Sequence, residues 1–179
     1  LVIGDTVIIQ RAGDVIPKVV SVLRDKRSGQ IRQIILPAQC PACGSEVLQA
    51  EGEVIARCTG GLRCSAQRKE RIRHFASRLA FDIEGLGDKL VNQLVDEGLI
   101  SSPADLFQLT LGQLVNLERM APKSANNFLE ALEKSKTTTL SRFIYALGIQ
   151  EVGESTARNL AQFYHGIAPL QQADEDSLQ

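Results

Sequence analysis

Four cysteines, the only ones in this 179-residue chain, constrain its fold more than any other feature. They are spaced as Cys40-x2-Cys43-x14-Cys58-x5-Cys64, in two short groups that can each turn around one ion. A segment of about 25 residues with few large apolar side chains cannot bury enough surface to fold alone, so a metal is expected to stabilise it. The spacing predicts one structural Zn²⁺ per chain with four thiolate ligands and no open coordination position for catalysis.

Two other interpretations of the cysteines remain open. They could form two disulfides, or they could be four unrelated buried thiols. Disulfides suit secreted proteins, whereas this sequence shows no signal peptide and otherwise resembles an intracellular protein. These considerations favour zinc.

Charge is balanced over the whole chain but not along it. The sequence has 20 Lys and Arg against 21 Asp and Glu, a net charge of −1. Between Arg57 and Arg78, however, seven basic residues face a single acidic one, Glu70. This local excess suits a polyanionic partner, although a solvated helix face would explain it equally well. No apolar run approaches 18 residues, so no membrane span is predicted.

Residues 1–36 are patterned as β-strands. Runs of β-branched residues alternate with short glycine-containing turns at 4–5, 12–14 and 28–29, which predicts three or four strands. Alone, such strands would leave open edges and half a core, so we expect the first part of a small barrel to lie outside this chain. The start at Leu1 rather than Met favours the same interpretation.

The second half of the chain is patterned as six or so short helices with tight turns. Apolar residues at helical spacing mark faces in residues 90–95, 125–132 and 157–164, and Gly98 is a typical helix stop. Further helices are predicted to begin at the capping residues Ser102, Thr110 and Thr139 or Ser141. The pattern indicates a compact all-α domain.

Within these helices an element repeats. Each copy has an apolar residue, a small residue and a polar triplet before a helix, and the copies span 84–91, 118–125 and 150–157. The small residues Gly87, Ala121 and Gly153 lie 34 and 32 positions apart. A similar period occurs in ankyrin and tetratricopeptide arrays, but their signatures are absent and the element here is a hairpin entering a helix.

Such hairpins can bind phosphate through the backbone. A sharp turn into a helix presents free N–H groups at the positive end of the helix dipole, which binds phosphate without reading bases. Lys89 and Lys123, two positions after the small residue, would add charge. One such turn alone would more simply be a helix connection; three at regular spacing beside a basic segment favour a phosphate site.

The repeat resembles the helix-hairpin-helix motif, whose core is Gly-apolar-Gly before a helix. Only Gly85-Leu86-Gly87 has both glycines, which makes the first copy the firmest expected clamp. The second copy has Arg119 and Ala121 at these places, and the third has Glu151 and Gly153. The methyl group of Ala121 argues against a positive φ or a close backbone approach at that position.

The order of segments resembles the C-terminal half of bacterial NAD-dependent DNA ligase over essentially the whole chain. The resemblance is carried, in order, by 11–17 (RAGDVIP), the four cysteines with 57–67 (RCTGGLRCSAQ), 73–78 (RHFASR) and the hairpins. It implies a multi-domain α+β chain: the C-terminal part of an oligonucleotide-binding (OB) barrel at 1–37, a small four-cysteine zinc finger at 38–66, and an all-α helix-hairpin-helix domain at 67–179 with three hairpins and the fourth missing.

The resemblance also implies a function. The family joins nicks in duplex DNA during replication and repair, through enzyme-adenylate and DNA-adenylate intermediates, with NAD and Mg²⁺ bound outside the region matched here. This portion would grip the backbone and minor groove of nicked double-stranded DNA without sequence specificity, as a monomer in the bacterial cytoplasm, associated with the nucleoid. The expected contact residues are Arg11, Lys18, Gly85, Gly87, Lys89, Lys123, Gly153 and Ser155.

The nucleophile of that family, in a Lys-x-Asp-Gly motif of the adenylylation domain, does not occur here. We therefore expect neither catalytic nor cofactor-binding residues in this chain and no nick sealing by it alone, without the adenylylation domain and the rest of the OB domain. Two alternatives remain: a zinc-stabilised helical scaffold for protein interaction, and an active enzyme.

Overall fold

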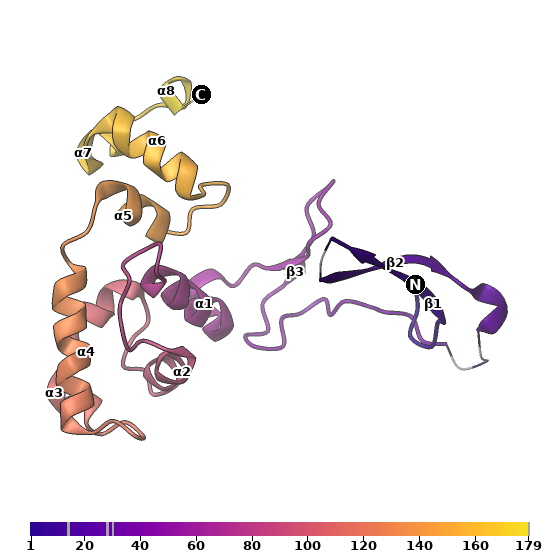
Figure 1. Ribbon diagram of the computed structural model, residues 1–179, viewed down its shortest axis with the longest axis horizontal. Coiled ribbons are helices and arrows are strands. Elements are labelled where there is room, and N and C mark those ends of the chain that lie inside the picture. The colour runs from indigo at the N-terminus through magenta and orange to yellow at the C-terminus, as the bar shows by residue number, and fades with distance from the viewer. Residues whose placement is uncertain (14, 28, 30, 179) are drawn as a thin grey trace.

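The computed structural model describes residues 1–13, 15–27, 29 and 31–178. A strand pair lies at one end of the elongated molecule and the helices gather at the other, with the cysteine segment between them (Figure 1). The change of sequence pattern along the chain therefore corresponds to a change of structure.

The N-terminal strands form a two-stranded antiparallel sheet. β1 (Val7–Ala12) pairs with β2 (Ile16–Val22), with a register shift between Ile8 and Ile9. A 3₁₀ helix (Arg24–Lys26) follows. The Arg27 guanidinium then returns to Asp5, with Nε 2.7 Å from Oδ1 and Nη2 3.1 Å from Oδ2. This ion pair joins the residues just before β1 to those just after the 3₁₀ helix.

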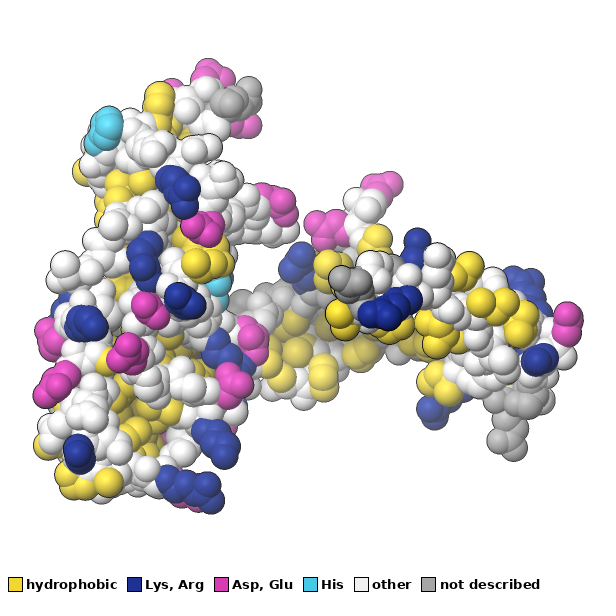
Figure 2. Space-filling model, viewed as in Figure 1, with side chains coloured by type: hydrophobic (Ala, Val, Ile, Leu, Met, Phe, Trp, Pro, Cys, Tyr) yellow, Lys and Arg dark blue, Asp and Glu magenta, His cyan; other side chains and the backbone are white. Residues whose placement is uncertain are grey.

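Among the described residues of 1–36, neither the third nor the fourth expected strand forms. There the described residues add only an isolated bridge between Ile3 and Arg32, and no closed barrel is present in the described part of the chain. Apolar side chains stay in solvent as a result: Val15 is 81% exposed and Ile35 80%. Figure 2 shows such side chains gathered over the N-terminal segment that contains β1 and β2 (residues 1–36, named the strand arm). The OB-like assignment is thus not confirmed.

The cysteine segment has little regular structure of its own. β3 (Val47–Leu48) pairs with β4 (Arg57–Cys58), and a bridge joins Gln39 to Glu46. A 3₁₀ helix (Gly61–Arg63) leads to the first α-helix. These short pairings bring the two cysteine groups together.

The helical part begins with α1 (Ser65–Ala76) and α2 (Asp88–Asp96), followed by a 3₁₀ helix (Pro103–Gln108). The remaining helices are α3 (Leu111–Leu114), α4 (Pro122–Ser135), α5 (Leu140–Ala146), α6 (Glu154–Tyr164), α7 (Ile167–Gln171) and α8 (Glu175–Leu178). The predicted starts are confirmed at Thr110 and Thr139, whose side chains accept from the N–H groups of Gln113 and Arg142. Thr139, not Ser141, caps α5.

One hydrophobic core joins the helices from α1 to α5. Ile72, Leu94, Ile100, Leu106 and Leu114 are fully buried in it. Aromatic rings add to the cluster; Phe75 and Phe81 stack with ring centroids 4.1 Å apart. The core fixes the turns between these helices. None of the described helices is both long and apolar enough to cross a membrane.

Candidate metal centre and nucleic-acid interface

The four cysteine sulfurs converge on one point. All four Sγ atoms lie within 4.8 Å of one another. The Cys40–Cys64 distance is 3.9 Å and the Cys43–Cys58 distance 3.5 Å. A tetrahedral zinc site with Zn–S bonds of about 2.3 Å places its sulfurs about 3.8 Å apart, whereas a disulfide needs about 2.05 Å. The cysteines are free thiols, and their arrangement fits a single structural Zn²⁺.

Neighbouring groups shift the pKa values of two of the four thiols in opposite directions. Hydrogen bonding by Ser45, first through its side chain, lowers the pKa of Cys43 to about 6. The Gly60 N–H donates to Cys58 Sγ at 3.3 Å and lowers its pKa, but burial and the neighbouring thiols of Cys43 and Cys40 outweigh this and raise the pKa to about 11. One ligand is therefore ready as a thiolate near neutral pH, whereas another must release a proton to bind metal.

Gly60 is required by space rather than by backbone conformation. Its φ of −65° and ψ of −17° suit any residue. A Cβ added there would lie 2.8 Å from Ser45 Oγ, 2.9 Å from Cys43 Sγ and 3.2 Å from Cys58 Sγ. The second cysteine group therefore approaches the first too closely for a larger residue.

The three repeated elements share one backbone shape. We name residues 77–87, 115–121 and 147–153 the first, second and third hairpins. The residue two positions before the N-cap of each following helix has a positive φ: 86° at Gly85, 61° at Arg119 and 63° at Glu151. In the second and third hairpins this residue is third in a four-residue turn, closed by N–H donation from Met120 to the Leu117 carbonyl and from Val152 to the Ile149 carbonyl. The repeat seen in the sequence is a structural repeat.

The small residue of each copy begins a helix. Gly87, Ala121 and Gly153 have φ of −84°, −70° and −80° with extended ψ. As the sequence indicated, Ala121 has no positive φ; the glycine-favouring conformation lies two positions earlier. Lys89, Lys123 and Ser155 stand at the second helical position and are exposed.

The helices that follow the hairpins start without side-chain caps. α2, α4 and α6 have no side-chain hydrogen bond at the N-cap, whereas α3 and α5, which precede hairpins, are capped by threonine. Early N–H groups of α2, α4 and α6 thus remain available to an external acceptor. In α4, Pro122 at the first position removes one such donor.

Two of these helices carry a carboxylate in the first turn, which would repel an anion. Asp88 Oδ1 lies 2.8 Å from Arg73 Nε, and Glu154 Oε1 lies 2.8 Å from Arg158 Nη2. Each carboxylate is therefore paired with a guanidinium, which reduces the repulsion.

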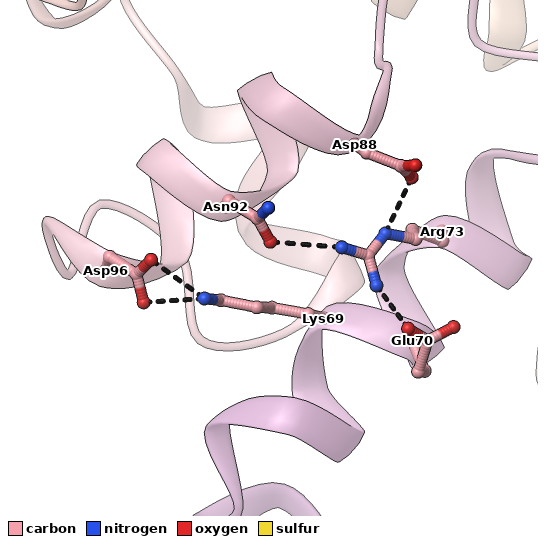
Figure 3. Close-up of polar contacts among 6 residues, drawn as sticks. All are labelled: Lys69, Glu70, Arg73, Asp88, Asn92 and Asp96. Carbon is pink, nitrogen blue, oxygen red and sulfur yellow. Dashed lines mark hydrogen bonds and ion pairs between the residues drawn. The ribbon is translucent and has the colours of Figure 1, made fainter. Parts of the chain in front are cut away.

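Two residues of the basic segment, Lys69 and Arg73, attach α1 to α2. Lys69 Nζ lies 2.7 Å from Asp96, and Arg73 Nη2 donates to Asn92 Oδ1 at 3.0 Å (Figure 3). Arg73 also pairs with Glu70 in its own helix. Arg68 donates to the Leu62 carbonyl at 3.2 and 3.0 Å. Contacts within the chain thus involve four of the seven basic residues of this segment, Arg57, Arg68, Lys69 and Arg73.

The strand-arm contact residues are not gathered at one point. Lys18 pairs directly with Gln10, and Arg11 pairs with Pro17. Because neighbouring residues of a strand point to opposite faces, Lys18 and Arg11 belong to opposite faces of the β1–β2 pair. Both are exposed, and both stay predictions as DNA contacts.

Some residues that hold the hairpins could not be predicted from the sequence, because their partners lie far along the chain. The Gln93 side chain of α2 accepts from Glu118 N–H at 2.9 Å and donates to its carbonyl at 3.4 Å, which holds the second hairpin. Arg142 of α5 donates to two carbonyls of the first hairpin, Arg78 and Ala80. Contacts between residues so far apart in the sequence have no recognisable local sequence pattern.

Comparison with known proteins agrees with this geometry. The family model of the NAD-dependent DNA ligase C4 zinc finger domain matches residues 39–66, which contain all four cysteines. A SAM-like helix-hairpin-helix tandem matches 77–134, and a helix-hairpin-helix motif matches 142–179. A DNA ligase from Cellvibrio japonicus (strain Ueda107) is 60% identical over 178 residues, or 99% of this chain.

The chain is therefore similar over nearly its whole length to part of a DNA ligase, and residues 39–66 match the zinc finger domain of NAD-dependent DNA ligases. It spans 26% of the length of that curated ligase. Within this portion, the ligase zinc finger coincides with the cluster of four thiols, and the helix-hairpin-helix matches cover all three hairpins.

Proposed function

We propose that this chain grips duplex DNA within an NAD-dependent DNA ligase. The whole enzyme would join nicks in replication and repair through adenylate intermediates, with NAD and Mg²⁺ bound elsewhere, in the bacterial cytoplasm at the nucleoid. The chain would act as a monomer on nicked duplex and hold the backbone and minor groove without reading sequence.

The observation that carries this proposal is the triple repeat of an uncapped helix start after the same turn. Free N–H groups at a helix N-terminus bind phosphate, and phosphate contacts carry no sequence information. Threonine side chains cap α3 and α5, whereas α1 and α7, like the helices after the hairpins, have no side-chain cap.

The proposed contacts extend from the hairpins to the strand arm. At the hairpins Gly85, Gly87 and Gly153 shape the turns, while Lys89, Lys123 and Ser155 lie at the following helix starts; Arg11 and Lys18 would add contacts from the strands. Zinc would be structural, held by Cys40, Cys43, Cys58 and Cys64, and would connect the strand segment to the helices.

We further propose the domain division 1–37, 38–66 and 67–179, with the first segment completing an OB barrel together with upstream chain. Its support is the exposed apolar surface of the arm, where Ile16 is 70% and Leu36 60% exposed. Barrel closure would cover such side chains and remove the open strand edges.

The deciding experiment is a salt titration of binding to nicked duplex. If the three hairpins each contact at least one phosphate, the plot of log affinity against log salt should have a slope of about −2.7 or steeper. Two duplexes of unrelated sequence should bind alike at fixed salt. Absence of binding, or a strong preference between the duplexes, contradicts the proposal. Incubation with radiolabelled NAD tests separately our expectation that these residues alone form no covalent adenylate.

A further inference from the structure

Arg142 connects two parts of the helical domain that are distant in sequence. Its Nε donates to the Ala80 carbonyl at 2.7 Å and its Nη2 to the Arg78 carbonyl at 2.6 Å. Nη2 also lies 3.9 Å from Asp82 Oδ2. One side chain of α5 therefore holds the backbone of the first hairpin at two points.

The backbone that Arg142 contacts also forms local hydrogen bonds of its own. The Ala80 and Asp82 N–H groups donate to the Ser77 carbonyl at 2.9 and 3.0 Å, and Ile83 N–H donates to the Ala76 carbonyl at 3.0 Å. Arg142 adds the connection from outside. A planar guanidinium can serve two acceptors at fixed separation, whereas a lysine ammonium on a flexible stem does not reproduce this geometry.

Arg142 belongs to α5, which leads directly into the third hairpin. It lines a hollow of about 250 Å³ with Leu79 of the first hairpin and with Glu154 and Arg158 of α6. It also lines a second hollow of about 530 Å³ together with Asp82 and other residues. Arg142 therefore borders hollows that it shares with the first hairpin and with the first turn of α6.

We propose that Arg142 is a positioning residue that holds the first and third hairpins in one fixed relation, so that the starts of α2 and α6 bind phosphates of the same duplex. This inference rests on the proposed function for its DNA part. The contacts themselves predict a local effect that needs no DNA.

The first test compares Arg142→Lys with the wild-type chain by hydrogen exchange without DNA. Loss of charge-assisted hydrogen bonds should speed exchange of the amides at 80–83 by about tenfold or more, with the amides of α4 unchanged. Lys134→Ala is the matched control: it removes a charge from the same larger hollow, and Lys134 makes no side-chain hydrogen bond or ion pair within the described residues. Unchanged exchange at 80–83 in Arg142→Lys overturns the inference.

The second test measures the salt dependence of duplex binding for the same variants, well below their unfolding temperatures. Arg142→Lys should give a shallower slope, by about 0.9 for each phosphate no longer contacted, although its charge is kept. Lys89→Ala should cost less affinity in the Arg142→Lys background than in the wild type. A direct phosphate contact by Arg142 would instead be rescued by lysine, and that result overturns the positioning role. A wild-type chain that binds no duplex overturns the proposed function. If the wild type binds and Arg142→Lys has the same steep salt slope, only the inference is overturned.

Discussion

Glycines in this chain serve different physical purposes that only the structure separates. Gly60 has an ordinary backbone conformation but no room for a Cβ, whereas Gly85 has a positive φ with the nearest atom for a Cβ 3.6 Å away on Phe128. Gly87 has neither restriction, because its φ is −84° and a Cβ there would meet nothing within 4 Å. Substitution by alanine should therefore produce three distinct results.

At Gly60, alanine should weaken the metal site. The added methyl displaces the sulfurs of Cys43 and Cys58, so Gly60→Ala should lower zinc affinity roughly 10- to 100-fold, as loss of a supporting contact commonly does. Competition with a chromophoric chelator measures this. Gly112→Ala, where a Cβ would meet nothing within 4 Å, is the matched control and should bind zinc normally. Equal zinc affinity in both variants would contradict the crowding seen at Gly60.

At the first hairpin, stability and DNA binding should separate. Gly85→Ala places a side chain in the left-handed region and should destabilise the chain by roughly 1 kcal/mol in thermal unfolding. Gly87→Ala should leave stability nearly unchanged, yet reduce duplex affinity if phosphate approaches the backbone there. Glu151→Gly relieves the same strain in the third hairpin and should raise the unfolding temperature. If Gly87→Ala lowers the unfolding temperature as much as Gly85→Ala does, the assignment of backbone strain to position 85 rather than position 87 is wrong.

Zinc binding should depend on pH in a definite direction. The pKa of Cys43 is lowered to about 6 and that of Cys58 raised to about 11, so in the metal-free protein at pH 7 the first is largely thiolate and the second thiol. Metal binding must remove the proton from Cys58, and affinity should therefore rise with pH. Calorimetry in buffers of different ionisation enthalpy should detect proton release at pH 7. An affinity that falls between pH 6 and 8 would contradict thiolate ligation.

At the scale of elements, the two ends of one helix offer a controlled comparison. α4 carries Lys123 in its first turn, after the second hairpin, and Lys134 in its last turn. Lys123→Ala should reduce duplex affinity and make the salt slope shallower by about 0.9, whereas Lys134→Ala should change neither. Anisotropy titrations at several salt concentrations measure both quantities. Equal effects would indicate a general charge effect and not a contact at the helix start.

Elements with local signals were predicted well from sequence, and those that depend on distant partners were not. Thr110 and Thr139 predict helix starts because each side chain accepts a hydrogen bond from an N–H group only three residues later. α1 was not assigned, because its apolar face is interrupted by basic residues whose partners Asp88 and Asp96 lie in the next helix. The positive φ at Arg119 and Glu151 opposes local preference and is imposed by the turn that each hairpin must make.

The strand segment shows the same limit. Its β-branched runs predict strands, and two of them pair. Residues such as Ile34 and Ile35, 59% and 80% exposed, have the composition of a strand without a partner strand in the described ranges. Strand formation needs a neighbour, and composition alone cannot supply one.

For the molecule as a whole, the candidate metal site and the helices are joined at one residue. Cys64 is one of the four candidate ligands, is 1% exposed, and is also the N-cap of α1; its carbonyl accepts the Arg68 N–H at 2.9 Å. A metal bound there would connect the cysteine segment directly to the helix that enters the main core.

Metal removal should therefore loosen the junction without unfolding the helices. Chelation should increase proteolysis within residues 38–64 and exchange in the first turn of α1, while most helical circular dichroism persists because the core around Ile72 and Leu94 contains no metal ligand. Readdition of zinc should reverse both effects. Complete loss of helical signal on chelation would show instead that the metal supports the whole fold.

The common backbone of the three hairpins has a consequence for mutational tolerance. Glycine, arginine and glutamate occupy the same left-handed position, and glycine and alanine share the helix start. Where recognition uses main-chain N–H groups, side chains at the left-handed position can be exchanged over generations without redesign of the contact. Such a surface can drift in composition while its geometry is inherited, and a search for invariant side chains would undercount its binding units.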